Sequence, residues 1–115
     1  MRKIVNLTRN TTLAENIELA NTPLKRMKGL LFRKTLEETS ALIIQSTSSI
    51  HTFFMQFSID ILFLDRDNRI LKLRHNIAPF RFILCPLSAK TTIEFPAGTL
   101  VSTQTQVGDF LSIEK

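Results

Sequence analysis

The run from His51 to Asp65 most constrains the fold of this 115-residue chain. It is the longest apolar stretch, and polar residues interrupt it at only a few positions. A segment of this kind is expected to run through the middle of a fold and to deliver a few polar groups to one edge. The triplet Gln56-Phe57-Ser58 predicts a bend, with one strand before it and another from Ile59 to Leu64.

Apolar alternation and turn residues along the rest of the chain indicate a domain built mainly of strands. An amphipathic helix is expected to start at Thr22 and Pro23, and a second, short helix is expected near Pro96. Expected strands far outnumber the two expected helices, which predicts a small β-rich α+β fold whose sheet curls toward a barrel or sandwich. The expected strands cover residues 2–8, 13–20, 41–45, 51–56, 59–64, 70–74, 81–85, 91–95 and the segment after Gly108.

Two polar turns are expected to join strands into hairpins. One is the run Arg9–Thr12, which separates the first two strands, and the other is the run Asp65–Arg69. The strand predicted over residues 13–20 has one apolar face, on which Glu15 is the exception. These features favour antiparallel pairing between strands that are neighbours in sequence.

The chain has a formal net charge of +5, and its basic residues are unevenly distributed. Positions 25 to 34 hold several basic residues and no acidic one. Such a cluster can bind anions, RNA or an acidic protein surface, and it can equally serve only to keep the domain soluble. The aromatic residues lie in apolar runs rather than among these positions, which disfavours nucleic-acid binding. The anion-binding candidates are Lys25, Lys28, Arg33 and Lys34.

The length suits one domain, residues 1–115, which is large enough to bury a core without disulfides. The single cysteine, Cys85, lies in an apolar run, which favours a buried structural thiol. His51 and His75 are too far apart for a zinc motif, so neither a metal nor a cofactor is expected. No signal peptide and no membrane-spanning stretch is recognisable, so we expect a cytoplasmic location.

Five motifs, in order along nearly the whole chain, resemble the domain-of-unknown-function family 192 of small uncharacterised prokaryotic proteins. Each motif is weak by itself, whereas the ordered set is specific. Leu31 replaces a frequent methionine, which is a mild packing change. The resemblance implies a compact β-rich α+β domain and brings no established substrate, cofactor or catalytic residue. The matching segments are Arg26-Met27-Lys28-Gly29-Leu30-Leu31-Phe32-Arg33, His51-Thr52-Phe53-Phe54-Met55, Ile59-Asp60-Ile61-Leu62-Phe63-Leu64-Asp65, Glu94-Phe95-Pro96-Ala97-Gly98 and Gly108-Asp109.

His51 is the first candidate for chemistry. In a strand over residues 51–56, His51, Phe53 and Met55 share one side, which places the imidazole at the edge of an apolar wall. An imidazole there can titrate near neutrality and act as an acid, a base or a donor to an anion. The structural alternative is a histidine whose ring nitrogen bonds a neighbouring carbonyl.

Asp60 is the second candidate, because apolar residues flank it and a buried carboxylate needs partners. The partner can be an arginine, Arg26 or Arg33, or free backbone N–H groups at the start of a helix. It can also be His51, which the carboxylate would orient as in a catalytic dyad. No G-x-S-x-G motif is present, which disfavours a hydrolase. Asp109 has the character of a turn residue.

These patterns predict a protein that binds an unknown small molecule or protein rather than one that catalyses a reaction. The expected pocket lies at His51, with Phe53, Met55, Arg26 and Asp60 around it. One alternative is a hydrolase-like enzyme that uses His51 as general acid or base. The other is an anion- or RNA-binding surface along residues 25–34.

Overall fold

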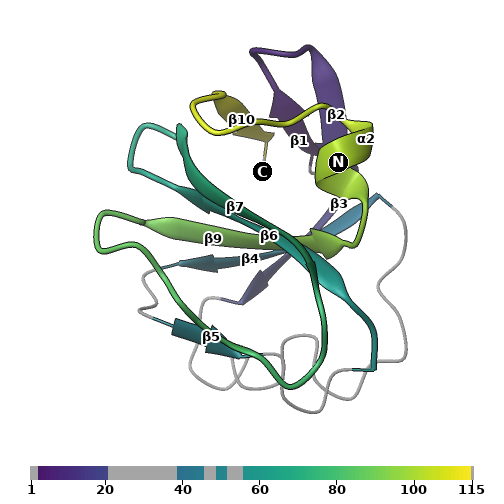
Figure 1. Ribbon diagram of the computed structural model, residues 1–115. Helices are drawn as coiled ribbons and strands as arrows, with labels where there is room; N and C mark the ends of the chain where they lie inside the picture. Colours follow the sequence, from purple (N-terminus) through teal and green to yellow (C-terminus); the bar gives the residue numbers. More distant parts are fainter. Residues whose placement is uncertain (1–2, 21–38, 46–48, 52–55, 115) are drawn as a thin grey trace.

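A computed structural model describes residues 3–20, 39–45, 49–51 and 56–114, without the side chains of Ala20 and His51. Within these ranges the chain forms three β-sheets and one short helix, α2 (Thr99–Ser102) (Figure 1). The fold is β-rich with a small helical part, as the sequence predicted, and the sheets of the described part do not close into a barrel.

A five-stranded sheet forms the centre of the fold, in the order β3-β4-β9-β6-β7. The β3–β4 pair is parallel, and the other neighbours in this sheet are antiparallel. Only β6 and β7 are joined by a turn, whereas β9 pairs with strands that are distant in sequence, and a long connection separates the parallel strands β3 and β4. The five strands are β3 (Asn16–Ala20), β4 (Ser40–Gln45), β6 (Ile59–Leu64), β7 (Ile70–Ile77) and β9 (Thr91–Pro96).

Strand β6 accounts for the long apolar run. All six of its residues are buried, because it lies between β9 and β7 and both faces of the sheet are covered. The chain bends at Gln56 and Phe57, as predicted. The turn after β6 is also confirmed, since the Asp65 side chain accepts hydrogen bonds from two backbone N–H groups, those of Asp67 and Arg69.

A three-stranded antiparallel sheet joins the two ends of the chain. Its order is β10-β1-β2, so β1 pairs with both its hairpin partner and the last strand. The predicted hairpin around Arg9–Thr12 is therefore confirmed. Figure 1 shows this sheet and α2 on one side of the central sheet. Its strands are β1 (Lys3–Asn6), β2 (Thr11–Ala14) and β10 (Leu111–Glu114).

Two short antiparallel strands, β5 (Ser49–His51) and β8 (Phe82–Leu84), form the third sheet, which we call the ribbon. Figure 1 shows β5 on the side of the central sheet opposite α2. Ile50 and Ile83 are register partners and both are buried. The ribbon therefore covers the second face of the central sheet with its own apolar side.

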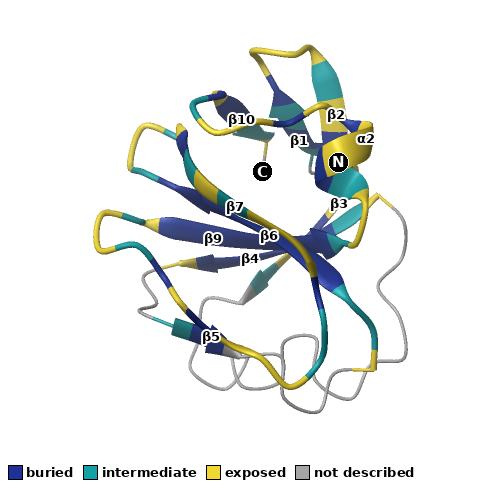
Figure 2. Cartoon of the chain, viewed as in Figure 1, coloured by how far each residue is buried: buried dark blue, intermediate teal, exposed yellow. Residues whose placement is uncertain are grey.

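The alternation of side chains along the central strands divides the buried residues into two clusters. In Figure 2 the three middle strands of the central sheet, β4, β9 and β6, are mostly dark blue, whereas β7 at the edge is largely exposed. The first cluster lies toward the three-stranded sheet and α2, and it contains Ile43, Leu62, Ile93, Phe95 and Leu100 among others. The second lies toward the ribbon, and it contains Leu42, Ile44, Ile50, Ile59, Ile61, Phe63, Ile77, Ile83 and Cys85.

The single strand predicted over residues 13–20 is wrong in one respect, because the chain changes sheets at Glu15. Residues before it form β2 and residues after it form β3. The backbone N–H groups of Glu15 and Asn16 both donate to the carbonyl of Thr39, which supports this corner. The exposed Glu15 was the exception on the apolar face, so the sequence did mark the break.

Other boundaries agree closely with the sequence. Strand β7 continues to Ile77, beyond the predicted end, because its pairing with β6 extends to Ile59. The short helix expected near Pro96 is α2. The helix expected after Thr22 and most of the strand expected over residues 51–56 lie outside the described residues.

Candidate functional site

Asp60 is completely buried, and backbone N–H groups satisfy its carboxylate. Oδ1 accepts from the N–H of Asn76 at 2.9 Å, and Oδ2 accepts from those of Gly98 and Leu100, each at 3.0 Å. Gly98 is the N-cap of α2 and has a φ of 96°, a conformation that glycine adopts without strain. Of the partners weighed from the sequence, the structure thus shows the backbone N–H groups at a helix start.

The side chain of Asp60 points toward the first-cluster side of the central sheet, away from the ribbon. Its hydrogen bonds lead to α2, which lies on the first-cluster side of the central sheet. The β5 strand, which contains His51, packs on the second cluster. The carboxylate of Asp60 therefore anchors α2 and the β6–β7 pair.

His51 is the last residue of β5, and its backbone is in register with Phe82 of β8. The remaining pocket candidates, Arg26, Phe53 and Met55, lie outside the described residues. The same holds for the anion-binding candidates, which are Lys25, Lys28, Arg33 and Lys34.

The outward side of the ribbon is apolar and exposed. Phe82 and Leu84 flank the buried Ile83, and they are 60% and 71% exposed. Phe80 and Leu87, on either side of β8, are also exposed. This surface adjoins the strand that carries His51, and the sequence reasoning did not identify it.

Glu94 is a second buried carboxyl residue, and its surroundings differ from those of Asp60. It lies in β9, in register with Leu42 of β4 and Ile61 of β6, and it is only 4% exposed. Alternation along β9 places it on the second-cluster face, together with Thr92. Burial raises the pKa of Glu94 to about 8, so its carboxyl group is mainly protonated at neutral pH.

Cys85 and Thr92 accompany Glu94 on this face. The Cys85 Sγ atom lies 3.8 Å from Thr92 Oγ1. Burial raises the pKa of the Cys85 thiol, the hydrogen bond with Thr92 opposes this effect, and the charge of Glu94 adds to it. The thiol is buried, as predicted, and its raised pKa keeps it in the unreactive protonated form.

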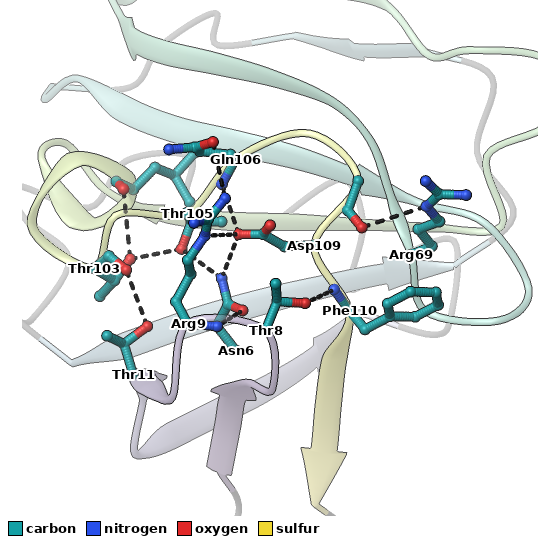
Figure 3. Close-up of polar contacts among 12 residues, drawn as sticks. Asn6, Thr8, Arg9, Thr11, Arg69, Thr103, Thr105, Gln106, Asp109 and Phe110 are labelled. Atoms are coloured by element: carbon teal, nitrogen blue, oxygen red, sulfur yellow. Dashed lines mark hydrogen bonds and ion pairs between the residues drawn. The ribbon is translucent and has the colours of Figure 1, made fainter.

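Asp109 is the centre of a polar network that joins the two ends of the chain (Figure 3). Its Oδ2 atom accepts from Asn6 Nδ2 at 2.9 Å, from Arg9 Nε at 3.1 Å and from the backbone N–H of Gln106 at 2.9 Å. Burial alone would raise the pKa of Asp109, but these hydrogen bonds and the charge of Arg9 lower it below its ordinary value. The carboxylate is therefore ionised, and its Oδ2 atom accepts three hydrogen bonds.

Threonine hydroxyls extend this network. Thr103 Oγ1 lies 2.7 Å from Thr105 Oγ1, and Asn6 Nδ2 reaches Thr105 Oγ1 at 3.3 Å. Thr11 donates to the carbonyl of Thr103. The positive φ of Gly108, 93°, confirms the predicted bend, whereas the burial of Asp109 was not foreseen. The network is a structural connection.

In the part of the chain that the structure describes, no group of three or more His, Cys, Asp or Glu side chains is placed to hold a metal ion. A separate finding concerns the helices: none within the described ranges is long and apolar enough to cross a membrane.

In the sequence, Glu94 is recognisable only as the first residue of the motif Glu94-Phe95-Pro96-Ala97-Gly98. The available signal was a carboxylate between Ile93 and Phe95 in a strand that is otherwise apolar or threonine. In a strand at the sheet centre, such a residue must be buried, and a buried carboxyl group is costly unless it serves a purpose.

Comparison with known proteins identifies relatives along nearly the whole chain. The family model DUF192, described as "Uncharacterized ACR", matches residues 5–113. A UPF0127 protein from Pyrococcus horikoshii is 33% identical over 109 residues, which cover 92% of this chain and 94% of that protein. A UPF0127 protein from Thermococcus sibiricus is 30% identical over 115 residues, which cover 96% of this chain and 74% of the relative.

Two solved structures share the fold. A crystal structure of a candidate transcription regulator from Sinorhizobium meliloti 1021 has a TM-score of 0.83 at 20% identity, and covers 97% of this chain and 91% of that one. A protein of unknown function from Novosphingobium aromaticivorans has a TM-score of 0.81 at 19% identity, covering 96% of this chain and 82% of that one. At these identities the likeness extends to the fold alone.

Proposed function

The chain belongs to the DUF192 family, whose members are uncharacterised, and we propose that it is a small non-enzymatic binding domain that contacts its ligand or partner through the ribbon. The proposal includes the neighbourhood of His51, with Phe53, Met55 and Arg26 as further contributors. Asp60 supports this arrangement from the other face of the sheet by anchoring α2.

The concentration of exposed apolar side chains at the ribbon carries the proposal. Of eight large apolar residues exposed in the described part, four lie between positions 80 and 87. They form the outward surface of β8 and of its flanking loops. Contiguous exposed apolar surface is costly in water, and it commonly marks a place where another molecule binds.

The location of His51 agrees with this surface. The backbone of His51 is the register partner of Phe82, so the end of β5 lies directly beside that residue. A ligand that covers Phe82 and Leu84 therefore also reaches the end of β5. An apolar surface next to a histidine suits a mainly apolar ligand that carries one polar or anionic group.

Three of the described buried groups, Asp60, Asp109 and Cys85, favour binding over catalysis. Asp60 and Asp109 each accept three hydrogen bonds and are committed to the fold. The Cys85 thiol is buried, and its pKa is raised. None of these three groups is available as a base or nucleophile for a ligand on the ribbon surface.

Matched pairs of substitutions test the proposal. Phe82→Ser with Leu84→Ser removes the apolar surface of the ribbon, and Val101→Ser with Val107→Ser removes equally exposed residues elsewhere. Anilinonaphthalene sulfonate, which fluoresces on apolar surfaces, should bind to wild type and to the control pair but not to the ribbon pair. A thermal-shift screen of metabolites and peptides should follow the same order. Equal binding by both double variants would exclude the ribbon.

The two alternatives from the sequence have their own tests. Catalysis by His51 requires that His51→Ala abolishes turnover with little change in stability. An anion- or RNA-binding surface along residues 25–34 requires an affinity that falls steeply with salt. A cytoplasmic location is part of the proposal, because a reducing compartment suits a chain with one free thiol.

A further inference from the structure

A second basic run lies in the sequence, beyond the one at positions 25 to 34. From Asn68 to Ile93 the chain contains no acidic residue and five basic ones. This run thus holds as many positive charges as the whole chain has in excess, which is +5. It includes β7 and β8, and with β8 the exposed apolar residues of the ribbon. The basic residues are Arg69, Lys72, Arg74, Arg81 and Lys90.

The pairing of β7 with β6 fixes the side of the central sheet on which two of these cations lie. Lys72 is opposed to Phe63, and Arg74 is opposed to Ile61. Directly opposed residues of an antiparallel pair project from the same face of the sheet. Phe63 and Ile61 belong to the second cluster, which also contains the buried residues of the ribbon. Both cations are exposed on the edge strand, and they therefore lie on the ribbon side of the sheet.

Arg81 brings a third cation into the apolar surface itself. It lies between Phe80 and Phe82 in the sequence, and all three residues are exposed. In Figure 2 the segment between β7 and β9, which passes beside β5, is mainly yellow. Among the described residues no salt bridge engages Lys72 or Arg74. The ribbon side of the molecule thus combines exposed apolar side chains with positive charge.

The apolar side chains of this surface project outward. Leu87 is fully exposed, and Leu84 is 71% exposed. Side chains that line a depression are covered in part by its walls, so a high exposure indicates a protruding surface. The boundary between the head groups and the acyl chains of a bilayer accepts protruding apolar side chains without a matching pocket.

We propose that the ribbon side of the molecule docks on a bilayer surface that contains anionic lipids. The exposed apolar side chains of residues 80–87 enter the boundary between head groups and acyl chains, and Lys72, Arg74 and Arg81 attract the lipid phosphates. The inference rests on the function proposed above, because it names the partner of the same surface. Docking of this kind requires no segment that spans the membrane.

The composition of the surface favours lipid over nucleic acid. Bases bind to unspecific single-strand sites by stacking on aromatic rings, and Leu84 and Leu87 offer no ring. Acyl chains contact leucine and phenylalanine equally well. Each Lys or Arg close to an anionic leaflet strengthens binding by about fivefold, while a small apolar anchor by itself gives only weak binding. Docking should therefore need both the apolar side chains and the cations.

Co-sedimentation with vesicles tests the apolar part. Wild type should bind vesicles of equal parts phosphatidylcholine and phosphatidylglycerol at least about tenfold more tightly than vesicles of phosphatidylcholine alone, and high salt should weaken this binding. Phe82→Ser with Leu84→Ser should lose binding to the mixed vesicles. Val101→Ser with Val107→Ser, which removes exposed apolar side chains elsewhere, should retain it.

A second pair of double variants tests the cations. Lys72→Gln with Arg74→Gln should weaken binding to the mixed vesicles by about tenfold or more, because two contributions are lost. Lys3→Gln with Arg66→Gln removes the same charge from β1 and from the turn after β6, and it should weaken binding much less. The comparison separates local attraction from an effect of net charge.

Single tryptophans report which side of the protein meets the lipid. The chain has no tryptophan, so one introduced ring supplies the whole signal. Phe82 and Val107 are matched in exposure, at 60% and 61%. With mixed vesicles that contain brominated lipid, the fluorescence of Phe82→Trp should shift to shorter wavelength and be quenched. The fluorescence of Val107→Trp should stay unchanged.

Several results would overturn the inference. They are the absence of wild-type binding to the mixed vesicles, equal binding to phosphatidylcholine alone, undiminished binding by either ribbon-side double variant, or equal quenching of both tryptophans. Tighter binding of a single-stranded oligonucleotide or an acidic peptide through the same residues would also overturn it. Thermal unfolding establishes which variants are folded, and the tryptophan pair decides the question if the serine variant does not fold.

Failure of this inference differs from failure of the proposed function. If wild type does not bind vesicles but anilinonaphthalene sulfonate still distinguishes the ribbon pair from its control, the lipid is excluded and the ribbon remains a binding surface. If the dye does not distinguish them either, the proposed function fails as well.

Discussion

Replacing Glu94 with glutamine should stabilise the protein at neutral pH, although it removes a family motif residue. The carboxyl has an ordinary pKa of 4.5, and burial raises it to about 8 in the folded protein. At pH 7 the unfolded chain is ionised at this position, while the folded protein retains the proton. The difference of 2.5 between pH 7 and 4.5 corresponds to about 3 kcal/mol, which wild type loses and the glutamine variant does not.

The sign of the pH dependence follows from the same linkage. Below pH 4.5 the carboxyl is protonated in both states, so the stability contribution is fully present. Between pH 4.5 and about 8 only the unfolded chain releases the proton, and the free energy of unfolding should fall by about 1.4 kcal/mol per pH unit. Above about pH 8 both states are ionised and the loss is complete.

Urea denaturation followed by circular dichroism, at intervals from pH 4 to 9, measures this dependence. Wild type and Glu94→Gln should have similar stability near pH 4.5 and should diverge as the pH rises. Glu114→Gln, at an exposed position on β10, serves as the matched control and should follow wild type. Parallel curves for wild type and Glu94→Gln between pH 5 and 8 would refute the reasoning, because they would mean that Glu94 titrates normally in the fold.

Three further substitutions test the structural contacts. Asp109→Ala should lower the free energy of unfolding at pH 7 by about 2 kcal/mol, mostly because the buried Asn6 amide and the partly buried N–H of Gln106 lose this acceptor, since Arg9 is 35% exposed. Urea denaturation should show that this loss shrinks as the pH falls below 3.8, because the folded state holds the pKa of Asp109 below that value. A loss of stability that stays the same at low pH would contradict this reasoning. Asp60→Asn should cost about 2 kcal/mol, because an amide cannot accept from all three backbone donors, and an unchanged thermal unfolding midpoint would show that Asp60 does not anchor α2. Gly98→Ala should cost about 1 kcal/mol in urea denaturation from backbone strain alone, since a Cβ there meets no atom within 4 Å; no loss of stability would argue against the positive φ.

The amino-acid sequence predicted most of the strands, because their signals are local. Alternation of apolar residues and turn residues depend on positions a few residues apart, and the hairpins around Arg9–Thr12 and Asp65–Arg69 follow directly from them. The break at Glu15 was visible as a charged residue on an apolar face but was read as an exception. A corner between two sheets depends on tertiary contacts. A single charged residue in the sequence therefore cannot show whether the strand ends there or only exposes one side chain.

The candidate site was predictable only in part. The buried carboxylate of Asp60 and its backbone partners at a helix start were among the sequence-based alternatives, because a charged residue in an apolar run needs donors. The exposed surface of the ribbon was not predictable, since Phe82 and Leu84 have the same apolar character as buried residues. His51 was placed at a strand edge by its pattern, and its role remains a prediction.

The sequence by itself determined the family, the β-rich class and the central place of the strand Ile59–Leu64, because each depends on residue order and periodicity along the chain. The tertiary structure decided which buried carboxyl groups have partners. Asp60 meets the N–H groups of α2, Asp109 meets donors 100 or so positions away, and Glu94 meets apolar neighbours on β4 and β6. All three are acidic residues in or beside strands, and only the pairing of distant strands distinguishes the two that accept hydrogen bonds from the one that lies among apolar side chains.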